Sequence, residues 1–271
     1  MHARARRSIL IATVALLLVL SLVWAVLHRR EPVYEGKTLS AWVQQGRSNQ
    51  WRGAAADEAR FAIRQIGTNS IPFLVNLIRA TDGPVKRKLR MMLPPTWHDA
   101  LHLKNDSGQI RRIGAHGLVA LGNAPSAVPA LIELATKHPD PDGRYIAVFA
   151  LRALGPAAEP AVPFFIQCLT NSDSAIRNEA AIGLVFVPAK LQMSLPHLVR
   201  YLESIKSMSG WEVTGAITLF GAYLGTNAQP MVPILLGLLN HDDTQVRESV
   251  TNALRWIDPD ATIKAGVSRR R

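Results

Sequence analysis

The sequence predicts an all-α fold, an α-solenoid (α-α superhelix) of about six helix pairs preceded by one N-terminal transmembrane helix. Three observations lead to this prediction. Residues 9–27 form an apolar run without a charge. In the rest of the chain, a proline inside an apolar run occurs five times, and three of the four steps between these prolines are 33–37 residues. Helix-ending pairs and arginines recur in the same register, which is typical of a repeated supersecondary unit.

Composition narrows the class of protein before any motif is considered. The chain has 271 residues, of which 48% are apolar and 19% are charged, and these values are typical of a folded protein. The single cysteine, Cys168, excludes an internal disulfide framework and a multi-cysteine zinc site. The net charge of +11 comes from residues 1–30, 79–106 and 269–271, so the rest of the body is close to neutral.

The apolar run 9–27 is predicted to be a transmembrane signal-anchor helix. Its 19 residues span about 28 Å at about 1.5 Å per residue, close to the hydrocarbon thickness of a bilayer. Arginines in the basic flank 1–8 and at the start of the linker 28–37 are nearly balanced. The N-terminal amine and the three arginines beside it favour an N-terminus in the cytoplasm. The body would then lie on the extracytoplasmic, periplasmic side of the inner (cell) membrane.

Two alternatives stay open for this segment. Val23-Trp24-Ala25 has residues of suitable size for a signal-peptidase site, and cleavage near Ala25 would give a soluble exported protein. The segment is also compatible with a buried helix of a soluble protein. The anchor and the cleaved signal both place the body outside the cytoplasm.

A repeat solenoid is predicted over residues 38–262, followed by a basic C-terminal tail at 263–271. A capping helix is expected around 38–46, with Leu39, Trp42 and Val43 facing inward. The repeating prolines are Pro72, Pro129, Pro163, Pro196 and Pro233. Each follows a pair that ends a helix: Ile66-Gly67, Leu121-Gly122, Leu154-Gly155, Val187-Pro188 and Leu224-Gly225, with Ile257-Asp258 as a sixth such end.

An arginine recurs ten residues before four of these pairs, and an aspartate lies four residues before three of the arginines. These residues are Arg111, Arg144, Arg177 and Arg247, with Asp140, Asp173 and Asp243. One unit is therefore predicted to be an "arginine helix", which contains this register and ends at glycine, followed by a "proline helix", which has its proline in the first turn. The arginines are expected to bond to the preceding unit or to the nearby aspartates, which is a structural role.

The residues that follow the proline form aligned columns. The positions two, three and five residues after the proline are apolar and are expected to be buried. The position four residues after the proline is mostly polar, and it is expected to face solvent.

A basic insert at residues 81–108 lengthens the first step between prolines to 57 residues. Residues 84–93 are predicted to form a short amphipathic helix with Val85, Leu89, Met92 and Leu93 on one side. This insert either covers the junction between the first two units or binds anionic lipid headgroups or an acidic partner. The residues that would make such a contact are Lys86, Arg87, Lys88 and Arg90.

The order Asp-x-x-x-Arg, Ala-x-x-x-Leu-Gly and Pro-x-Leu resembles short HEAT-like repeats of the bilin-lyase type over about residues 54–262. Residues 34–42 and 62–72 are similar to segments of bacterial membrane-anchored or exported proteins with HEAT-repeat domains, a family whose function is mostly unknown. The resemblance implies the fold and export. It implies no activity, because the matching residues belong to the scaffold.

The sequence contains no recognised catalytic or cofactor motif. His-Glu-x-x-His, Gly-x-Ser-x-Gly, Gly-x-x-x-x-Gly-Lys and a glycine-rich dinucleotide loop are absent. His98 and His102 lie one helical turn apart, but two ligands do not make a closed metal site. Cys168 falls in an apolar column and is expected to be buried and inert. We expect a protein that is not an enzyme and has no cofactor, metal site or small-molecule substrate.

The predicted function is a non-catalytic protein–protein interaction scaffold, with proline helices lining the concave surface of the solenoid. The residues expected to contact a protein partner are Asn76, Arg79, Glu133, Lys137, Gln167, Arg200 and Glu203. One alternative is a nucleic-acid-binding HEAT-repeat protein, which would need a stripe of Lys and Arg along one face. Another is a HEAT-like enzyme, such as a lyase, with an unrecognised site.

Overall fold

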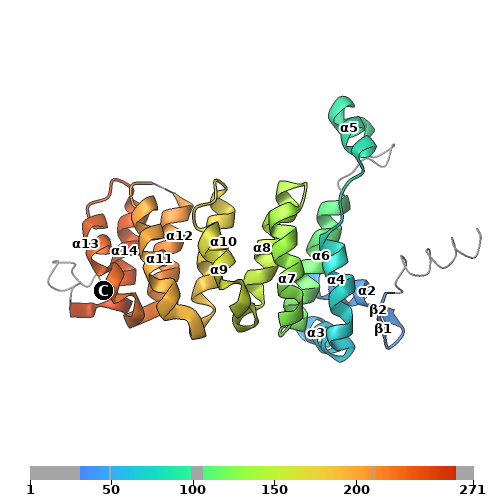
Figure 1. The fold of residues 1–271 in the computed structure, drawn as a ribbon, viewed down its shortest axis with the longest axis horizontal. Helices are drawn as coiled ribbons and strands as arrows, with labels where there is room; N and C mark the ends of the chain where they lie inside the picture. Colours follow the sequence, from blue (N-terminus) through green and yellow to red (C-terminus); the bar gives the residue numbers. More distant parts are fainter. Residues whose placement is uncertain (1–30, 49, 99–105, 209, 261–271) are drawn as a thin grey trace, which may run out of the picture.

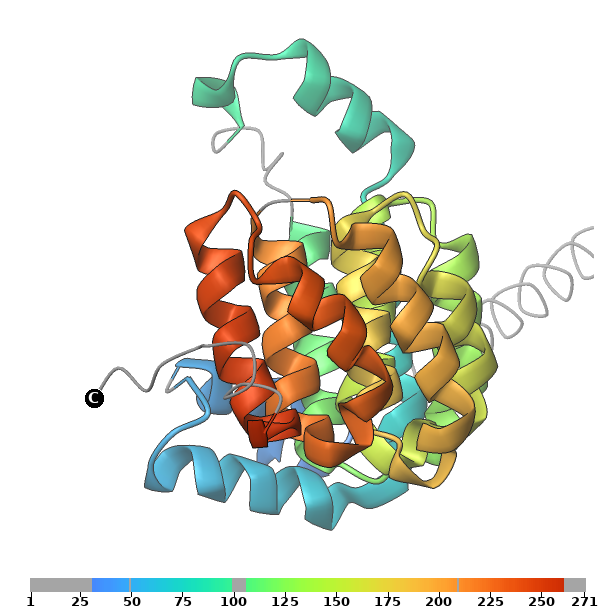
Figure 2. The same cartoon turned by 90° about the vertical axis from the view of Figure 1, so that its left-hand side faces the viewer.

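The computed structural model of the chain describes residues 31–48, 50–98, 106–208 and 210–260. Within these ranges the helices stand side by side across the long axis of the molecule and follow one another in chain order (Figure 1). The fold is an all-α solenoid, as the repeat pattern predicts. A view along the stack shows the described helices gathered into one body, with the segment that follows α4 projecting from it (Figure 2).

The predicted anchor at 9–27 and the tail at 263–271 lie outside the described residues. Within the described ranges, no single helix is long and apolar enough to cross a bilayer. One pair of consecutive helical segments, Ser174–Val185 and Pro188–Ile205, passes the same length and composition criteria only when taken together, and it is bent by 89°.

A small β-hairpin begins the described part, where the sequence analysis expected a linker. Strand β1 (Val33–Tyr34) pairs antiparallel with β2 (Lys37–Thr38). Both residues of the intervening Glu35-Gly36 turn have positive φ, 48° and 75°, as a two-residue type I′ turn requires. The hairpin is fastened to the first helix because the Trp42 indole donates a hydrogen bond to the Tyr34 carbonyl oxygen at 3.1 Å.

Helix α2 (Leu39–Ser48) caps the N-terminal end of the stack and packs on α3 (Ala54–Ile66). Leu39, Trp42 and Val43 are each buried, as the sequence predicts for the capping helix. The first core residues of the solenoid are therefore supplied by an element outside the repeat.

The two kinds of helix alternate along the rest of the chain. The proline helices are α4 (Ile71–Ile78), α7 (Val128–Lys137), α9 (Val162–Cys168), α11 (Leu191–Ile205) and α13 (Val232–Leu238). The helices in the arginine register are α3, α6 (Asp106–Leu121), α8 (Pro141–Ala153), α10 (Ser174–Val185), α12 (Trp211–Leu219) and α14 (Thr244–Ile257).

Short helical turns connect each arginine helix to the next proline helix. They are the 3-10 segments η1 (Gly67–Ser70), η3 (Pro125–Ala127), η4 (Gly155–Ala161), η5 (Pro188–Lys190) and η7 (Gly225–Met231), and a π-helical turn η6 (Phe220–Leu224) extends α12. Four of these connections contain the predicted glycine in a left-handed conformation: Gly67, Gly122, Gly155 and Gly225 have φ of 69°, 82°, 55° and 51°. Glycine is favoured there because it has no Cβ to clash.

Helix α11 departs from the predicted position of the proline. It begins at Leu191, so Pro196 lies inside the helix and not in its first turn. Pro188 has already started η5, and the residues from 191 to 195 include neither glycine nor proline to stop the helix. Pro196 is exposed, so the carbonyl group that loses its amide partner can be hydrated.

The closest helix pairs also differ from the predicted units. Proline helices pack on the arginine helix that follows them, as α4 does on α6 and α7 does on α8, and α11 alone among those described contacts the preceding α10 as closely as the following α12. The predicted unit instead joined an arginine helix to the proline helix after it. Those two helices meet less closely, because a 3-10 segment such as η4 lies between them. A repeat therefore begins at a proline helix.

The core follows the predicted columns with one correction. The residues two positions after each proline are all buried: Leu74, Leu131, Phe165, Leu198 and Leu235. The fifth position is buried except at Leu77, and the fourth position is exposed in every unit, as predicted. The third position is only half-buried except at Val75, because the proline helices meet few neighbours on that side.

Every recurrent arginine bonds to the loop that follows the preceding proline helix. The guanidinium Nη1 atoms of Arg111, Arg144, Arg177 and Arg247 donate to the carbonyl oxygens of Ala80, His138, Asn171 and His241, at 2.8, 2.8, 2.7 and 2.6 Å. A carbonyl in a loop has no helical amide to bind it, so the guanidinium supplies it with a charged hydrogen-bond donor. The predicted structural role of these arginines is confirmed.

Two of the arginines also reach forward to the next unit. Arg111, whose side chain is 2% exposed, pairs with Asp140 at 3.1 Å and with Asp142 at 2.7 Å. Arg177 makes a two-pronged pair with Glu212, with both N–O distances 2.7 Å. Each of these two guanidinium groups therefore links the loop after a proline helix, its own arginine helix and the start of the next arginine helix.

Removing the buried Arg111 should destabilise the solenoid far more than removing its neighbour. We expect Arg111→Ala to lower the free energy of unfolding by about 3 kcal/mol, because two carboxylates and the Ala80 carbonyl group lose their cation. Arg112→Ala should cost less than about 1 kcal/mol, since the Arg112 side chain is 61% exposed and lies 4.0 Å from Asp142. Urea unfolding of the full chain measures both values, and equal losses would contradict the role assigned to Arg111.

Candidate interaction surface

The two kinds of helix form two rows with different spacing. Successive arginine helices, such as α8 and α10 or α12 and α14, pack directly against each other. Successive proline helices make few contacts along their row. Both rows contain the same run of units, so the closely spaced row lies on the inner side of the curve. We call the exposed side of α6, α8, α10, α12 and α14 the inner face, and that of the proline helices the outer row.

The predicted partner-contacting residues lie on the outer row. Asn76, Arg79, Glu133, Lys137, Gln167, Arg200 and Glu203 are all exposed on α4, α7, α9 and α11. Glu133 and Lys137 are 3.7 Å apart, and Glu203 pairs with Lys206. Their exposure agrees with the sequence pattern, whereas the geometry gives the concave side to the other row. Binding of a partner by these residues stays a prediction.

A shallow hollow of about 640 Å³ is built on the inner face by three successive arginine helices, α10, α12 and α14. Its aromatic side chains are Trp211 and Tyr223. Most of the other lining groups are neutral and able to form hydrogen bonds: Asn178, Thr214, Thr218, Gln245, Ser249 and Asn252. Glu248 is the one charged residue in this lining.

Aromatic residues extend the hollow along the stack. Phe186 and Tyr223 from consecutive units meet edge to face with ring centroids 5.0 Å apart. Trp256, in the next unit, lies against Gly221, where an added Cβ would come within 2.9 Å of the indole. Trp211, Tyr223 and Trp256 are each at least 50% exposed, although large aromatic side chains usually bury most of their surface.

A second aromatic cluster joins the N-terminal units on the same row. His116 lies 6.3 Å from Trp51 and 5.9 Å from Phe149, measured between ring centroids. Burial lowers the pKa of His116, and Arg47 and Arg112 lower it further. The imidazole is therefore neutral at pH 7 and packs as an aromatic ring.

The sequence analysis missed these aromatic positions, although a signal exists. Phe186, Tyr223 and Trp256 each directly precede the helix-ending pair of their unit, so they share one register. The aligned columns of the proline helices do not include these residues. Aligning the last turn of the arginine helices would have shown the stripe.

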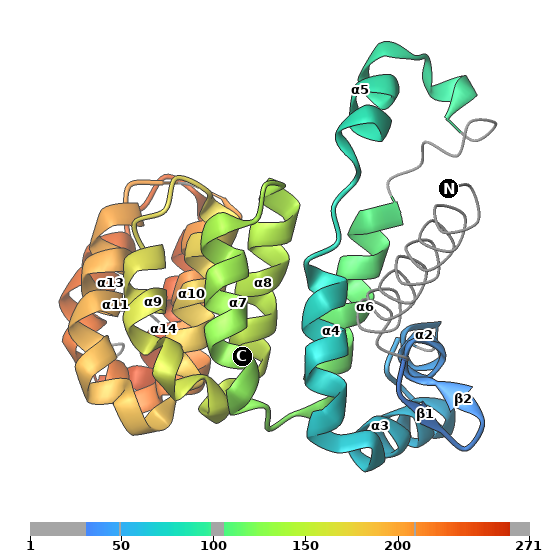
Figure 3. The same cartoon turned by 45° about the vertical axis from the view of Figure 1, so that its right-hand side comes forward.

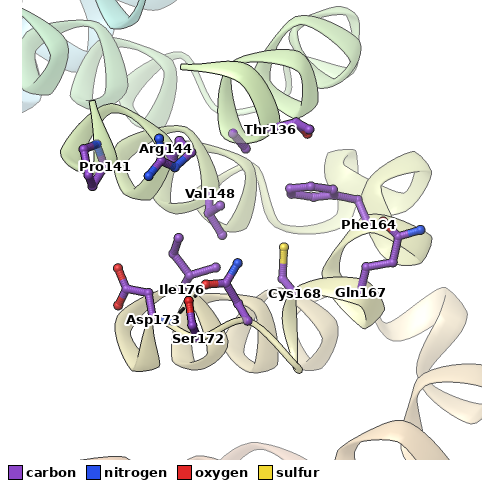
Figure 4. Close-up of a pocket in the computed structure, with 12 residues that line it drawn as sticks. Thr136, Pro141, Arg144, Val148, Phe164, Gln167, Cys168, Ser172, Asp173 and Ile176 are labelled. Carbon is purple, nitrogen blue, oxygen red and sulfur yellow. Dashed lines mark hydrogen bonds between the residues drawn. The ribbon is translucent and has the colours of Figure 1, made fainter. Parts of the chain in front are cut away.

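A separate crevice of about 420 Å³ opens between α7, α8, α9 and α10 (Figure 4). Figure 4 shows the sulfur of Cys168 pointing into the space between Val148 and Phe164. The charged groups at its rim already have structural partners, because Arg144 donates to the His138 carbonyl and Asp173 accepts from the Ala175 amide. Cys168 is buried, as predicted, and desolvation raises the pKa of its thiol to about 11.

The insert contains the predicted helix, α5 (Pro84–Met92), followed by η2 (Pro95–Trp97). This helix projects from the side of the stack, clear of α4 and α6 (Figure 3). It does not cover the junction between the first two units, which was one of the two roles expected for it. Asp99 and His102 lie outside the described residues, and among the described ones no group of three His, Cys, Asp or Glu side chains could hold a metal ion.

Comparison with known proteins supports the repeat. Residues 95–185 and 128–207 match the family of HEAT repeats. A crystal structure of an engineered protein is similar at 17% sequence identity with a TM-score of 0.45, covering 84% of this chain and 97% of that chain. The comparison with curated proteins gives no match.

The thiol of Cys168 should react slowly in the folded chain. With a pKa of about 11, about one thiol in a thousand is ionised at pH 8, against roughly a quarter in an unfolded chain with an ordinary pKa. We expect Ellman's reagent to label the native protein on the order of a hundredfold more slowly than the urea-unfolded protein. Equal rates would show that the thiol is accessible in the crevice.

Proposed function

We propose that this chain, which carries HEAT repeats, is a non-catalytic scaffold that binds a protein partner on its inner face. HEAT repeats commonly serve as protein-interaction scaffolds, and an elongated stack offers a long continuous surface for this purpose. The binding site that we propose is the hollow over α10, α12 and α14, together with the aromatic side chains at its edge.

The exposed aromatics are the observation that carries the proposal. Trp211, Tyr223 and Trp256 leave at least half of their surface in water, at a cost that binding to a partner would remove. Tyrosine and tryptophan are enriched among the residues that contribute most binding free energy in protein interfaces. Their occurrence on one face of consecutive units favours a partner that contacts several units at once.

The remaining groups of the hollow suit a polypeptide backbone. The side-chain amides of Asn178, Gln245 and Asn252 can both donate and accept hydrogen bonds. Exposed backbone amides and carbonyls need such partners when an extended segment is bound. Phosphate recognition would instead call for arginine or lysine in the lining, and none is present there.

Photo-cross-linking in the cells that make the protein would test this site. A photoreactive phenylalanine analogue placed at Tyr223 should give a discrete adduct with a partner protein. Trp211→Ala in the same chain should reduce that adduct about tenfold or more, because a central aromatic contact typically contributes more than 1.4 kcal/mol. The readout is a blot of the adducts.

The matched control is the same analogue at Gln167, an exposed position on the outer row. We expect no discrete adduct from this position. Adducts formed at Gln167 and not at Tyr223 would support the residues predicted from sequence and contradict the inner-face site.

We further propose that the scaffold is tethered to a membrane by residues 9–27, with its repeats on the extracytoplasmic side. The support is the uncharged apolar run of 19 residues and the arginines that precede it. A partner would then be sought among proteins of the cell envelope.

A periplasm-active phosphatase fused after Arg271 tests the tether. We expect the fusion to be active and to keep its full length on a blot. An active but shortened product would mean a cleaved signal peptide. An inactive fusion would place the repeats in the cytoplasm and would contradict the proposed topology.

A further inference from the structure

The projecting segment formed by α5 and η2 has an apolar side that no other helix of the described chain covers. Val85, Leu89 and Met92 are spaced i, i+4 and i+7, so they lie within about 60° of one another around the helix. Val85 is 69% exposed and Met92 is 70% exposed. Trp97 in η2 is also largely exposed, which extends the apolar surface beyond the helix.

Basic residues flank this strip on both sides. At about 100° per residue, Lys88 lies next to one edge of the strip and Lys86 lies next to the other. Asp82 is the acid at the base of the segment, and it pairs with Arg90 and lies 4.0 Å from the Lys86 ammonium group. Asp82 therefore offsets one charge of Lys86, Lys88 and Arg90, and the segment keeps a net positive charge around its apolar strip.

We propose that α5 and η2 form a membrane-contacting arm that lies in the interface of a bilayer with anionic headgroups. A short helix with an apolar side between lysines fits that interface. Its apolar side chains can enter the acyl region while its ammonium groups contact the lipid phosphates. An interfacial tryptophan is favoured at the same depth. This arm is distinct from the inner face and does not depend on the function proposed for it.

Other occupants of the strip fit the charges less well. A second copy packed strip to strip would bring the flanking lysines of both copies together, which is unfavourable. The bilayer surface satisfies both features at once, and the apolar run at 9–27 of the same chain gives a second, separate reason to expect a membrane nearby. One short arm binds weakly, but two membrane signals in one chain act together.

Quenching by brominated lipid acyl chains would locate the arm. The full chain carries Met92→Cys in a Cys168→Ala background, labelled with bimane, and is mixed with or reconstituted into vesicles of equal phosphatidylglycerol and phosphatidylcholine. We expect the bromines to quench this probe. The matched control is Met193→Cys, an exposed methionine on α11, which should not be quenched.

Charge reduction tests the lysines. The double change Lys86→Gln and Lys88→Gln should weaken contact with anionic vesicles roughly thirtyfold, and quenching should fall to the level found with phosphatidylcholine alone. Equal quenching in neutral vesicles would overturn the role of the anionic headgroups.

Two further outcomes would overturn the arm itself. A probe that stays in water in every vesicle would show that the strip does not enter the bilayer. An unquenched probe with an apolar emission spectrum would show that protein covers the strip. Neither outcome bears on the photo-cross-linking at Tyr223 or on the phosphatase fusion, so failure of this proposal is distinguishable from failure of the proposed function.

Discussion

The loops after four of the proline helices (α4, α7, α9 and α13) contain carbonyl groups that lie outside any helix, and the stack depends on how those groups are satisfied. An arginine from the following helix donates to them at Ala80, His138, Asn171 and His241. This bond needs a long side chain that crosses the loop, and it turns the two helices into a fixed hairpin. At Arg111 and Arg177, the same guanidinium also holds a carboxylate of the next unit, so the orientation of one hairpin constrains the next.

The curvature follows from the way these hairpins pack. The arginine helices pack directly on one another along their row and bury small residues such as Ala147 and Ala180, while successive proline helices make few contacts. The inner face is therefore crowded enough for side chains of neighbouring units to meet, as Phe186 and Tyr223 do. The wider spacing of the outer row leaves crevices such as the one beside Cys168.

The sequence predicts the repeat and most of the core, because the buried positions of a helix recur at a fixed spacing and are occupied by apolar residues. It predicts the exposed column that contains Glu133 and Arg200, and the buried column that contains Leu131 and Phe165. The concave side is different, since it depends on which helices pack closely in three dimensions and no single helix encodes that choice. The sequence also does not show which neighbouring helices pair. The turn at the glycine and the loop whose carbonyl binds the arginine are both short connections, so either could join the two helices of a unit.

A comparison of distances along the two rows tests whether the arginine helices lie on the inner side of the solenoid. Residues 178 and 248 occupy equivalent inner positions, and residues 167 and 237 occupy equivalent outer positions, with 70 residues in each interval. Nitroxide pairs at these positions, in a Cys168→Ala background, give both distances by pulsed electron spin resonance. We predict a clearly shorter distance for 178–248 than for 167–237. An equal or longer distance for 178–248 would contradict the assignment of the arginine helices to the inner side of the solenoid.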